Sequence, residues 1–450
     1  MNSEPRLKFE LRALIRLAFP VALSQVALFA MQIVDTMFVG RLGAIPLGGV
    51  SVANAYFGTV MVTGVGLLLG LDFWIAKSFG AGQTEEAHSY TAQGLWLATF
   101  IAIPSTLLLY FARSTFTFFG IDENINQQAS VYLSLLCWSL YPTLIYIVLK
   151  QYLQALNNPV PTLVILIVAN LVNILANWVF VFGHLGFTAR GIEGAALATL
   201  VSRVFMIVAL LIYLLIHEWN RKPSLLRASF KYSREKISQL TRLGIPASGQ
   251  LLLEVSAFSL STLMAGKLGA IPLSAHQIVL QIASITFMIP LGISSATSVR
   301  IAQALGGGQP KRAARIGWLA LALGGGFMAC TGIGLYVFQL PILGLFTDDR
   351  AIIQTAGTLL LIAALFQVFD GIQVVGSGAL RGVGNTRTSM LSNLFGHWII
   401  GLPTSYFLCL VLHYGIRSLW IGLSLGLISV ALLLSSFWWL RTRKMIAISA

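Results

Sequence analysis

The heptapeptide RLGAIPL at Arg41–Leu47 recurs 226 residues later as KLGAIPL at Lys267–Leu273, with six of its seven residues unchanged. Alignment at this offset extends outward without a gap, and 18 of the 72 residue pairs between positions 16–87 and 242–313 are identical. A weaker match at an offset of 227 pairs Leu153 with Leu380 and Asn158 with Asn385. A register held over this length predicts that the chain is built from two duplicated halves.

The chain is too apolar for a protein that is surrounded by water. Of its 450 residues, 57% are hydrophobic and 10% are charged, whereas an average soluble domain carries roughly 25% charged residues. This composition excludes a soluble globular enzyme, a disordered chain and a nucleic-acid-binding protein. The cysteines lie inside apolar runs, with the spacing of neither a disulfide framework nor a metal site: Cys137, Cys330 and Cys409. We therefore expect an integral membrane protein.

Long apolar runs recur along both halves. A helix that crosses a hydrocarbon core of about 30 Å needs roughly 20 apolar residues, and the sequence contains twelve such runs. Their approximate bounds are 14–39, 46–76, 92–111, 129–149, 161–182, 192–216, 240–265, 272–299, 316–340, 352–376, 390–412 and 416–440. Continuous runs of this length are not typical of the short alternating strands of a transmembrane barrel. The predicted fold is an all-α integral membrane protein with twelve transmembrane helices.

The duplication and the number of runs together predict two six-helix bundles. Residues 1–216 are expected to form the N-terminal lobe, 217–239 a cytoplasmic linker loop and 240–450 the C-terminal lobe. Because six is an even number, both lobes enter the membrane in the same direction and are related by a pseudo-two-fold axis along the membrane normal. This arrangement is typical of secondary transporters that work by alternating access.

Other functions lack their usual signals. An ion channel would show a glycine-rich or acidic filter ring. An ATP-driven pump would show a GxxxxGK[ST] loop, and Gly306–Gly308 are not followed by the required Lys and Ser or Thr. The sequence offers neither a histidine cluster nor a nucleophile–base pair, so we expect no enzyme activity.

Basic residues are unevenly divided between the two sides of the membrane. With twelve spans both termini share one side, and that side carries 22 of the 29 Lys and Arg residues, including Arg6 and seven bases from Arg221 to Arg242. Arg203 lies within a span. The opposite side carries six: Arg41, Arg113, Arg190, Lys267, Arg350 and Arg417. Because cytoplasmic loops collect Lys and Arg, both termini are predicted to be cytoplasmic, and the net charge of +14 requires no nucleic-acid partner.

Three acidic side chains lie well inside the apolar runs, where ionised groups are costly and usually functional. Asp35 lies in the first run, Glu254 in the seventh and Asp370 in the tenth. Asp72, near one end of the second run, suits a capping or interfacial role equally well. A buried carboxylate without a basic partner can bind and release a proton, because burial favours its neutral form. With neutral oxygen ligands around it, such a carboxylate can instead bind Na⁺.

Polar side chains of the fifth and sixth runs supply such oxygens. Asn173 and Asn177 are one helical turn apart and share a helix face, and Thr199 adds a hydroxyl. Hydrogen bonding between helices is an alternative role for the asparagines. At the 226-residue offset Asp35 corresponds to Ser261, so the acids are not repeated. We interpret this difference as a division of labour between coupling ion and substrate.

Six motifs follow one another over nearly the whole chain: VDTMFVGRLG at Val34–Gly43, NILANWVFVFG at Asn173–Gly183, EVSAF at Glu254–Phe258, AHQI at Ala275–Ile278, FDGIQVVGSGALRGVGNT at Phe369–Thr386 and GLPTSY at Gly401–Tyr406. In this order they resemble the multidrug and toxic compound extrusion (MATE) family, most closely its bacterial NorM-type branch. The resemblance implies an antiporter of the bacterial cytoplasmic membrane that expels cationic or amphiphilic organic compounds in exchange for Na⁺ or H⁺. We expect it to work as a monomer in contact with membrane lipid, without a cofactor.

The resemblance also implies roles for the polar residues of the N-terminal lobe. Asp35 matches the acid of the first helix, and Asn173, Asn177 and Thr199 match the polar positions grouped with it. Some relatives carry Asp at the position of Asn177, so this site has one potential charge less. These four residues are one candidate site for Na⁺, with a proton as the alternative coupling ion.

In the C-terminal lobe, Glu254 and Asp370 match the acids tied to cation coupling in the NorM-type branch. They are the second candidate site for Na⁺. An aromatic hydroxyl sometimes found four residues before the second acid is replaced here by Phe366, so one ion ligand is missing.

Two other transport functions remain open. An exporter of one specific metabolite would use the same fold, and a neutral metabolite would require no base within the membrane. A flippase for a lipid-linked precursor is less favoured, because binding of its pyrophosphate would need a groove rich in basic residues. Only Arg203 is available for such a groove.

Overall fold

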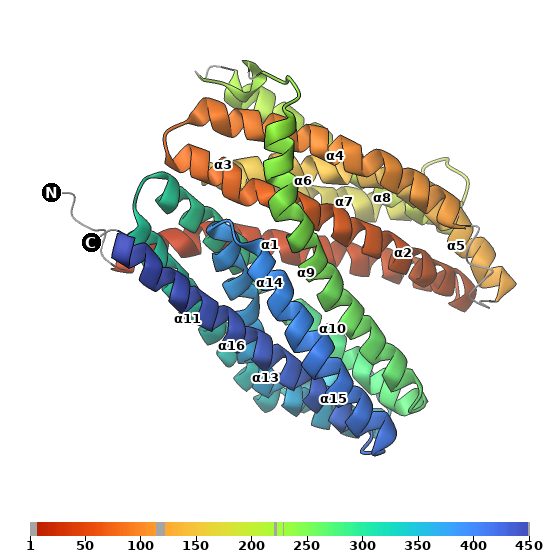
Figure 1. Ribbon diagram of the computed structural model, residues 1–450. Coiled ribbons are helices and arrows are strands. Elements are labelled where there is room, and N and C mark those ends of the chain that lie inside the picture. Colours follow the sequence, from red (N-terminus) through yellow and green to blue (C-terminus); the bar gives the residue numbers. More distant parts are fainter. Residues whose placement is uncertain (1–6, 114–121, 220–222, 228, 449–450) are drawn as a thin grey trace. The chain divides into compact units, whose positions relative to one another are not determined.

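The computed structural model describes residues 7–113, 122–219, 223–227 and 229–448 (Figure 1). Arg6, Arg221 and Lys222, three of the bases counted above, and part of the expected linker lie outside these residues. Throughout the described part the chain forms helices and connecting turns, without a strand. Twelve helical segments within it are long and apolar enough to cross a membrane. This finding confirms the predicted all-α fold with twelve spans.

Most spans are single helices. These are α1 (Leu7–Gly40), α4 (Thr84–Ala112), α7 (Val160–Phe182), α8 (Gly191–Glu218), α9 (Arg234–Gly266), α10 (Ala270–Gly306), α11 (Pro310–Val337), α13 (Arg350–Gly382) and α16 (Ile416–Ile448). Three spans are divided into shorter segments. The second consists of α2 (Ala44–Leu68) and α3 (Gly70–Gly80), and the fourth of α5 (Glu123–Leu136), η2 (Cys137–Ser139) and α6 (Leu140–Ala155). The eleventh consists of α14 (Thr386–Asn393), η4 (Leu394–Gly401), α15 (Leu402–Tyr406) and η5 (Phe407–Val411). Short connecting helices are η3 (Leu225–Arg227) and α12 (Gln339–Gly344).

Helix ends fall at corresponding positions of the two halves. α1 ends at Gly40 and α9 ends at Gly266, and the next helix begins four residues later in both. Each turn contains a glycine with positive φ, Gly43 at 115° and Gly269 at 111°, a conformation that other residues adopt only with strain. The repeated heptapeptide is therefore the turn between two spans, and the turn requires its glycine.

Two pairs of corresponding spans differ in regularity. α10 is continuous, whereas its counterpart is interrupted at Leu69 between α2 and α3. The eleventh span contains two π-helical segments, η4 and η5, whereas its counterpart α7 is a regular helix. A π-helical segment changes the number of residues per turn. The side chains of the eleventh span are therefore not arranged around the helix axis as those of α7 are.

The described chain divides into two compact units. The N unit comprises Leu23–Gly244, and the C unit comprises Ile245 onward together with the described residues before Leu23. The unit boundaries therefore lie inside α1 and α9, whereas the sequence suggests a boundary in the linker at 217–239.

Two contacts hold the start of α1 in the C unit. The carboxylate of Glu10, whose side chain is fully buried, accepts hydrogen bonds from Arg300 Nη2 at 2.7 Å and from Arg312 Nε at 2.6 Å. Further along α1, Ala22 packs so closely on Gly292 of α10 that a side chain at this glycine would overlap it. Ion pairing and close packing thus explain why the first turns of α1 group with the second half of the sequence.

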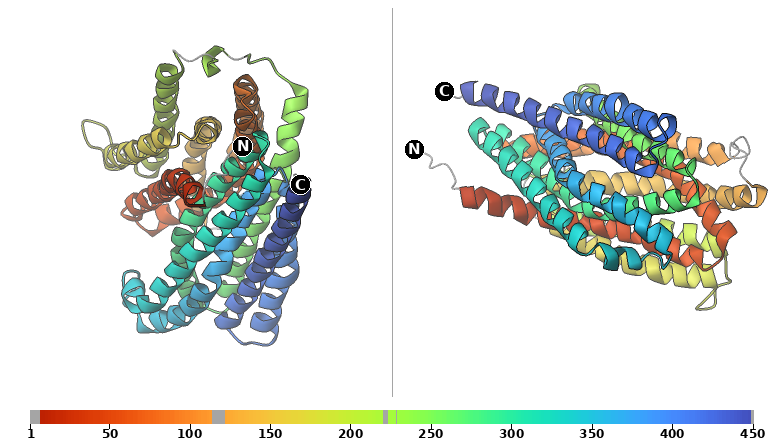
Figure 2. Two further views of the ribbon diagram at one scale, coloured as in Figure 1. Left: turned by 90° about the vertical axis from the view of Figure 1, so that its left-hand side faces the viewer. Right: turned by 90° about the horizontal axis from the view of Figure 1, so that it is seen from below.

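Phe230, Lys231 and Ser233, in the polar segment between α8 and α9 (Figure 2), are hydrogen-bonded to α4 in the N unit. Gln93 donates from Nε2 to the carbonyl of Lys231 at 2.8 Å, and its Oε1 accepts from the amide of Ser233 at 2.9 Å. Trp96 Nε1 donates to the carbonyl of Phe230 at 2.9 Å. These three residues of the expected linker are thus bound to the N unit, and α9 already begins within the linker at Arg234.

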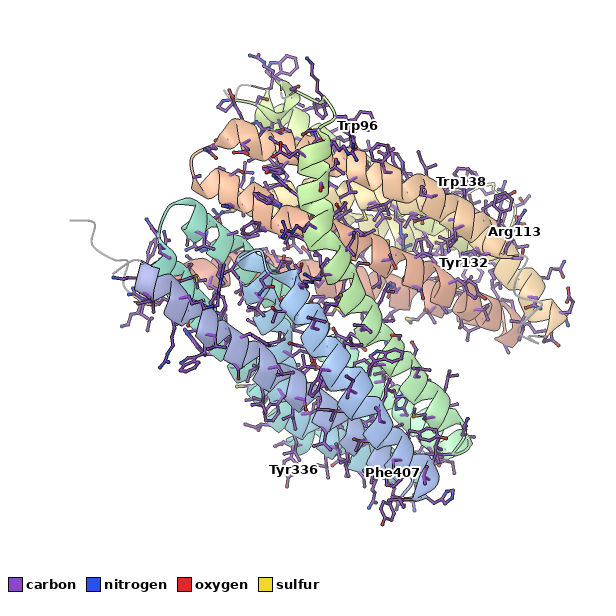
Figure 3. All side chains as sticks on the ribbon, viewed as in Figure 1. Trp96, Arg113, Tyr132, Trp138, Tyr336 and Phe407 are labelled. Atoms are coloured by element: carbon purple, nitrogen blue, oxygen red, sulfur yellow. The ribbon has the colours of Figure 1, made fainter. Side chains whose placement is uncertain are left out.

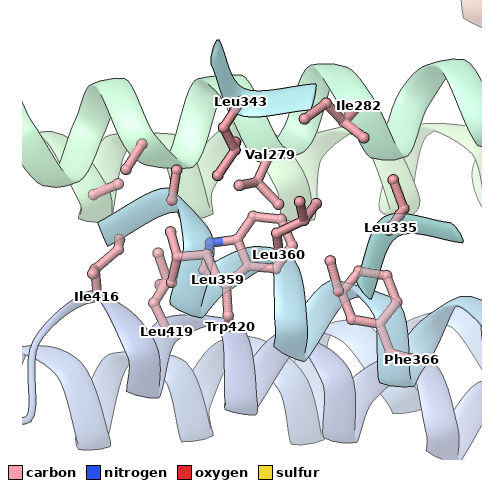
Figure 4. Close-up of a cluster of buried hydrophobic side chains, with 14 of the residues drawn as sticks. Val279, Ile282, Leu335, Leu343, Leu359, Leu360, Phe366, Ile416, Leu419 and Trp420 are labelled. Carbon is pink, nitrogen blue, oxygen red and sulfur yellow. The ribbon is translucent and has the colours of Figure 1, made fainter. Parts of the chain in front are cut away.

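A buried apolar cluster forms part of the core of the C unit (Figure 4). The ring of Trp420 stacks on that of Phe366 at a centroid distance of 5.8 Å, and its Nε1 donates to Nδ1 of His276 at 3.1 Å. Phe366 is only 4% exposed. Its ring therefore contributes to the packing of the C unit.

Candidate functional site

Asp35 lies in the part of α1 that belongs to the N unit, and it is only 7% exposed. Asn173 and Asn177 of α7 donate from Nδ2 to Oδ1 of this carboxylate at 3.0 and 2.8 Å, and Thr199 of α8 donates to Oδ2 at 2.9 Å. The structure thus brings together the four residues that the sequence suggests for this site. The carboxylate is the acceptor in all three contacts, and hydrogen bonds to a charged acceptor are roughly twice as strong as neutral ones.

The two asparagines meet Asp35 together because they lie one turn apart on α7. Nδ2 of Asn177 also donates to the carbonyl of Asn173 at 3.0 Å. Oδ1 of Asn177 is buried and has no hydrogen-bond partner within the described part of the chain. A buried acceptor without a donor costs roughly 1–3 kcal/mol. A cation bound beside Asp35 would gain this oxygen as a ligand.

Two further residues of the N unit belong to the surroundings of Asp35. Tyr132 of α5, labelled in Figure 3, is buried with 1% of its surface exposed, and it lies near Thr199. Arg203 lies one turn after Thr199 on α8, and its charge acts on both Asp35 and Tyr132. Its guanidinium donates to Oγ of Ser139 at 2.9 Å. Arg203 was recognisable in the sequence as a base within a span, whereas no spacing signal pointed to Tyr132.

The C unit contains the second acidic centre. Glu254 of α9 and Asp370 of α13 are 9% and 8% exposed, and the charge of Glu254 acts on Asp370. Gln373, one turn after Asp370, donates from Nε2 to Oε1 of Glu254 at 3.2 Å. Among the described residues no base forms an ion pair with either acid. The two acids, 116 positions apart in sequence, thus share one buried polar cluster, and Gln373 is its unpredicted member.

The remaining chemically notable residues have structural surroundings. Asp72 is buried in the first turn of α3, where the helix dipole favours an acid, and the charge of Lys150 acts on it. In the described part of the chain no group of three or more His, Cys, Asp and Glu side chains is placed to hold a metal ion. A Na⁺ ion in either centre would therefore depend on amide and hydroxyl oxygens as well as carboxylates.

The duplicated helical fold and its two buried acidic centres define a multi-pass membrane protein of the secondary-transporter class. The family model MatE matches residues 20–179 and 246–407, and these two matches begin 226 residues apart. The chain therefore belongs to the MatE family.

Relatives and solved structures agree with this assignment. Over 444 residues the chain is 37% identical to the probable multidrug resistance protein NorM of Mesorhizobium japonicum, a match that covers 96% of this chain and 94% of that protein. It is 30% identical to the multidrug resistance protein NorM of Photobacterium profundum, with 95% and 94% covered. The solved structure of the eukaryotic MATE transporter AtDTX14 matches with a TM-score of 0.88, 24% identity and 98% of each chain covered. That structural match supports the fold.

Proposed function

We propose that the chain is a cation-coupled multidrug efflux antiporter. It exports cationic or amphiphilic organic compounds in exchange for Na⁺ or H⁺, and its two units provide access to each side of the membrane in turn. The observation that carries this proposal is the pair of buried acidic centres, Asp35 in the N unit and Glu254 with Asp370 in the C unit. The names of the bacterial relatives support export of drugs.

Exchange requires that ion and substrate bind alternately. Before an ion binds, the acidic centres carry negative charge, which attracts an organic cation. Ion binding removes this charge and therefore weakens substrate binding. The ion drives the change of access only through different affinities for the two states. At a negative interior, inward movement of one positive charge contributes about 2.3 kcal/mol per 100 mV.

We place the chain in the cytoplasmic membrane of a bacterium, with both termini in the cytoplasm, as a monomer surrounded by lipid. Twelve candidate spans and bacterial relatives support the membrane location. The division of basic residues, 22 against six, supports the orientation. Na⁺ or H⁺ is a transported ion in this proposal and not a cofactor.

The test is efflux of a fluorescent organic cation from proteoliposomes, with a Na⁺ gradient and a pH gradient imposed separately. Efflux that a Na⁺ gradient drives, and that is lost in the double variant Glu254→Gln, Asp370→Asn, would assign ion coupling to the C unit. Efflux that a pH gradient drives, and that is lost in Asp35→Asn, would assign ion coupling to the N unit. Asp348→Asn, which changes an exposed acid, is the control and should transport normally. If several unrelated cations show no gradient-driven flux in the unaltered protein, the proposal is wrong and an exporter of one specific metabolite is favoured.

A further inference from the structure

A cavity of about 280 Å³ lies in the N unit. Arg113, directly after the last residue of α4, and Arg190, directly before the first residue of α8, contribute to its lining. Ser130 and Ser134 of α5 lie one helical turn apart and line it as well. Because Arg113 and Arg190 adjoin the ends of α4 and α8, the charged part of the cavity lies near the boundary between the apolar part of the membrane and water.

Two of the six bases on the side opposite the termini thus meet in one cavity. Positive charge is generally sparse on that side, so this pairing stands out from the overall distribution. The guanidinium of Arg113 lies over the ring of Tyr110, at 4.1 Å from its centroid. Glu193 lines the same cavity, yet within the described part of the chain it forms no ion pair with either arginine. The lining therefore carries two guanidinium groups and one carboxylate, a net charge of plus one.

The lining combines groups that bind phosphate with groups that contact acyl chains. Guanidinium forks match phosphate oxygens in geometry and charge. The hydroxyl of Ser130 is an additional donor, whereas that of Ser134 donates to the carbonyl of Val131 at 2.7 Å. The remaining lining side chains are Val131, Leu135 and Leu197. Trp138 lies in η2, four residues beyond Ser134, and is labelled in Figure 3. It is 58% exposed, and tryptophan is enriched at the membrane–water boundary.

We propose that this cavity binds the phosphate group of an anionic phospholipid in the leaflet opposite the termini. Arg113 and Arg190 bind the phosphate oxygens, and the hydroxyl of Ser130 donates to the headgroup. The apolar side chains contact the glycerol backbone and the first acyl carbons. A lipid with one net negative charge neutralises the cavity, whereas a zwitterionic lipid leaves its positive charge in place. Free inorganic phosphate carries the same recognised group but gains nothing from the apolar lining.

The test measures lipid retention by native mass spectrometry. The purified full-length protein is equilibrated with equal amounts of phosphatidylglycerol and phosphatidylcholine, and the lipids that remain bound are counted. We expect the unaltered protein to prefer phosphatidylglycerol. The double variant Arg113→Gln, Arg190→Gln should bind this lipid about tenfold more weakly or worse, since each charge-assisted contact is worth more than one neutral hydrogen bond. A thermal unfolding curve of each variant verifies that it is folded.

The matched control is Lys267→Gln, Arg417→Gln, which removes two charges from the same predicted side but outside the cavity. It should retain phosphatidylglycerol as the unaltered protein does. An equal loss in the control, or equal retention of both lipids by the unaltered protein, overturns the proposal. Displacement of the lipid by millimolar inorganic phosphate would show that the apolar contacts contribute nothing, and it overturns the assignment to a lipid. None of these outcomes depends on transport activity, so the proposed function is tested separately.

Discussion

Replacement of Glu10 by Gln removes the charge that holds the start of α1 in the C unit. The Glu10 side chain is fully buried and accepts two charge-assisted hydrogen bonds, at 2.7 Å from Arg300 and 2.6 Å from Arg312. Bonds of this type contribute about 1.5–3 kcal/mol each. The arginine side chains are 13% and 27% exposed, so water partly replaces the lost partner. We therefore expect Glu10→Gln to lower the free energy of unfolding by about 2–4 kcal/mol.

The assay is denaturant-induced unfolding in detergent micelles, monitored by tryptophan fluorescence. A double-mutant cycle with Arg300→Gln isolates the pairwise contribution, because the second substitution should cost less once Glu10 is absent. Asp348→Asn, at an exposed acid, should change the free energy by no more than about 0.5 kcal/mol. A loss below about 1 kcal/mol for Glu10→Gln, or full additivity in the cycle, would refute the inference that this ion pair anchors α1.

Three further changes test the fold. Gly43→Val should cost about 1–3 kcal/mol of stability, because φ is 115° there, while Gly40→Ala, with open space around it, should be near neutral in the same unfolding assay. Gln93→Ala leaves two backbone groups of the segment before α9 without partners, so limited proteolysis should cut that segment faster than in the unaltered protein. Gly317→Ala places a methyl group against the indole of Trp438 and should lower the unfolding midpoint by an amount equivalent to about 1–3 kcal/mol; an unchanged midpoint would contradict the packing.

Much of the fold could be predicted because membrane spans and duplication both leave strong local signals. Hydropathy alone places twelve runs, and the repeated heptapeptide marks a turn whose glycine has a fixed backbone requirement. The unit boundaries were not predictable in this way. Glu10 is close to other charged residues in sequence and has the pattern of a solvated end, and only the packing of α10 and α11 buries it.

The candidate site was predictable where a polar side chain is unusual in its surroundings. Asp35, Asn173 and Asn177 stand out in apolar runs at helical spacing. Tyr132 and Gln373 do not, because tyrosine and glutamine occur in many spans and their partners are on other helices. The polar segment before α9 shows the same limit, since its composition is that of a solvated loop whether or not Gln93 binds it.

The two acidic centres differ in what a cation would gain by binding. Asp35 already accepts three hydrogen bonds, and the charge of Arg203 acts on it. Glu254 and Asp370 repel each other, and Gln373 donates to only one of them. A cation bound between like charges relieves their repulsion as well as pairing with each. We therefore expect the C unit to bind Na⁺ more tightly than the N unit, so that Na⁺-driven flux is lost in Glu254→Gln, Asp370→Asn and largely kept in Asp35→Asn. The opposite pattern would show that the hydrogen bonds around Asp35 rearrange to admit the ion.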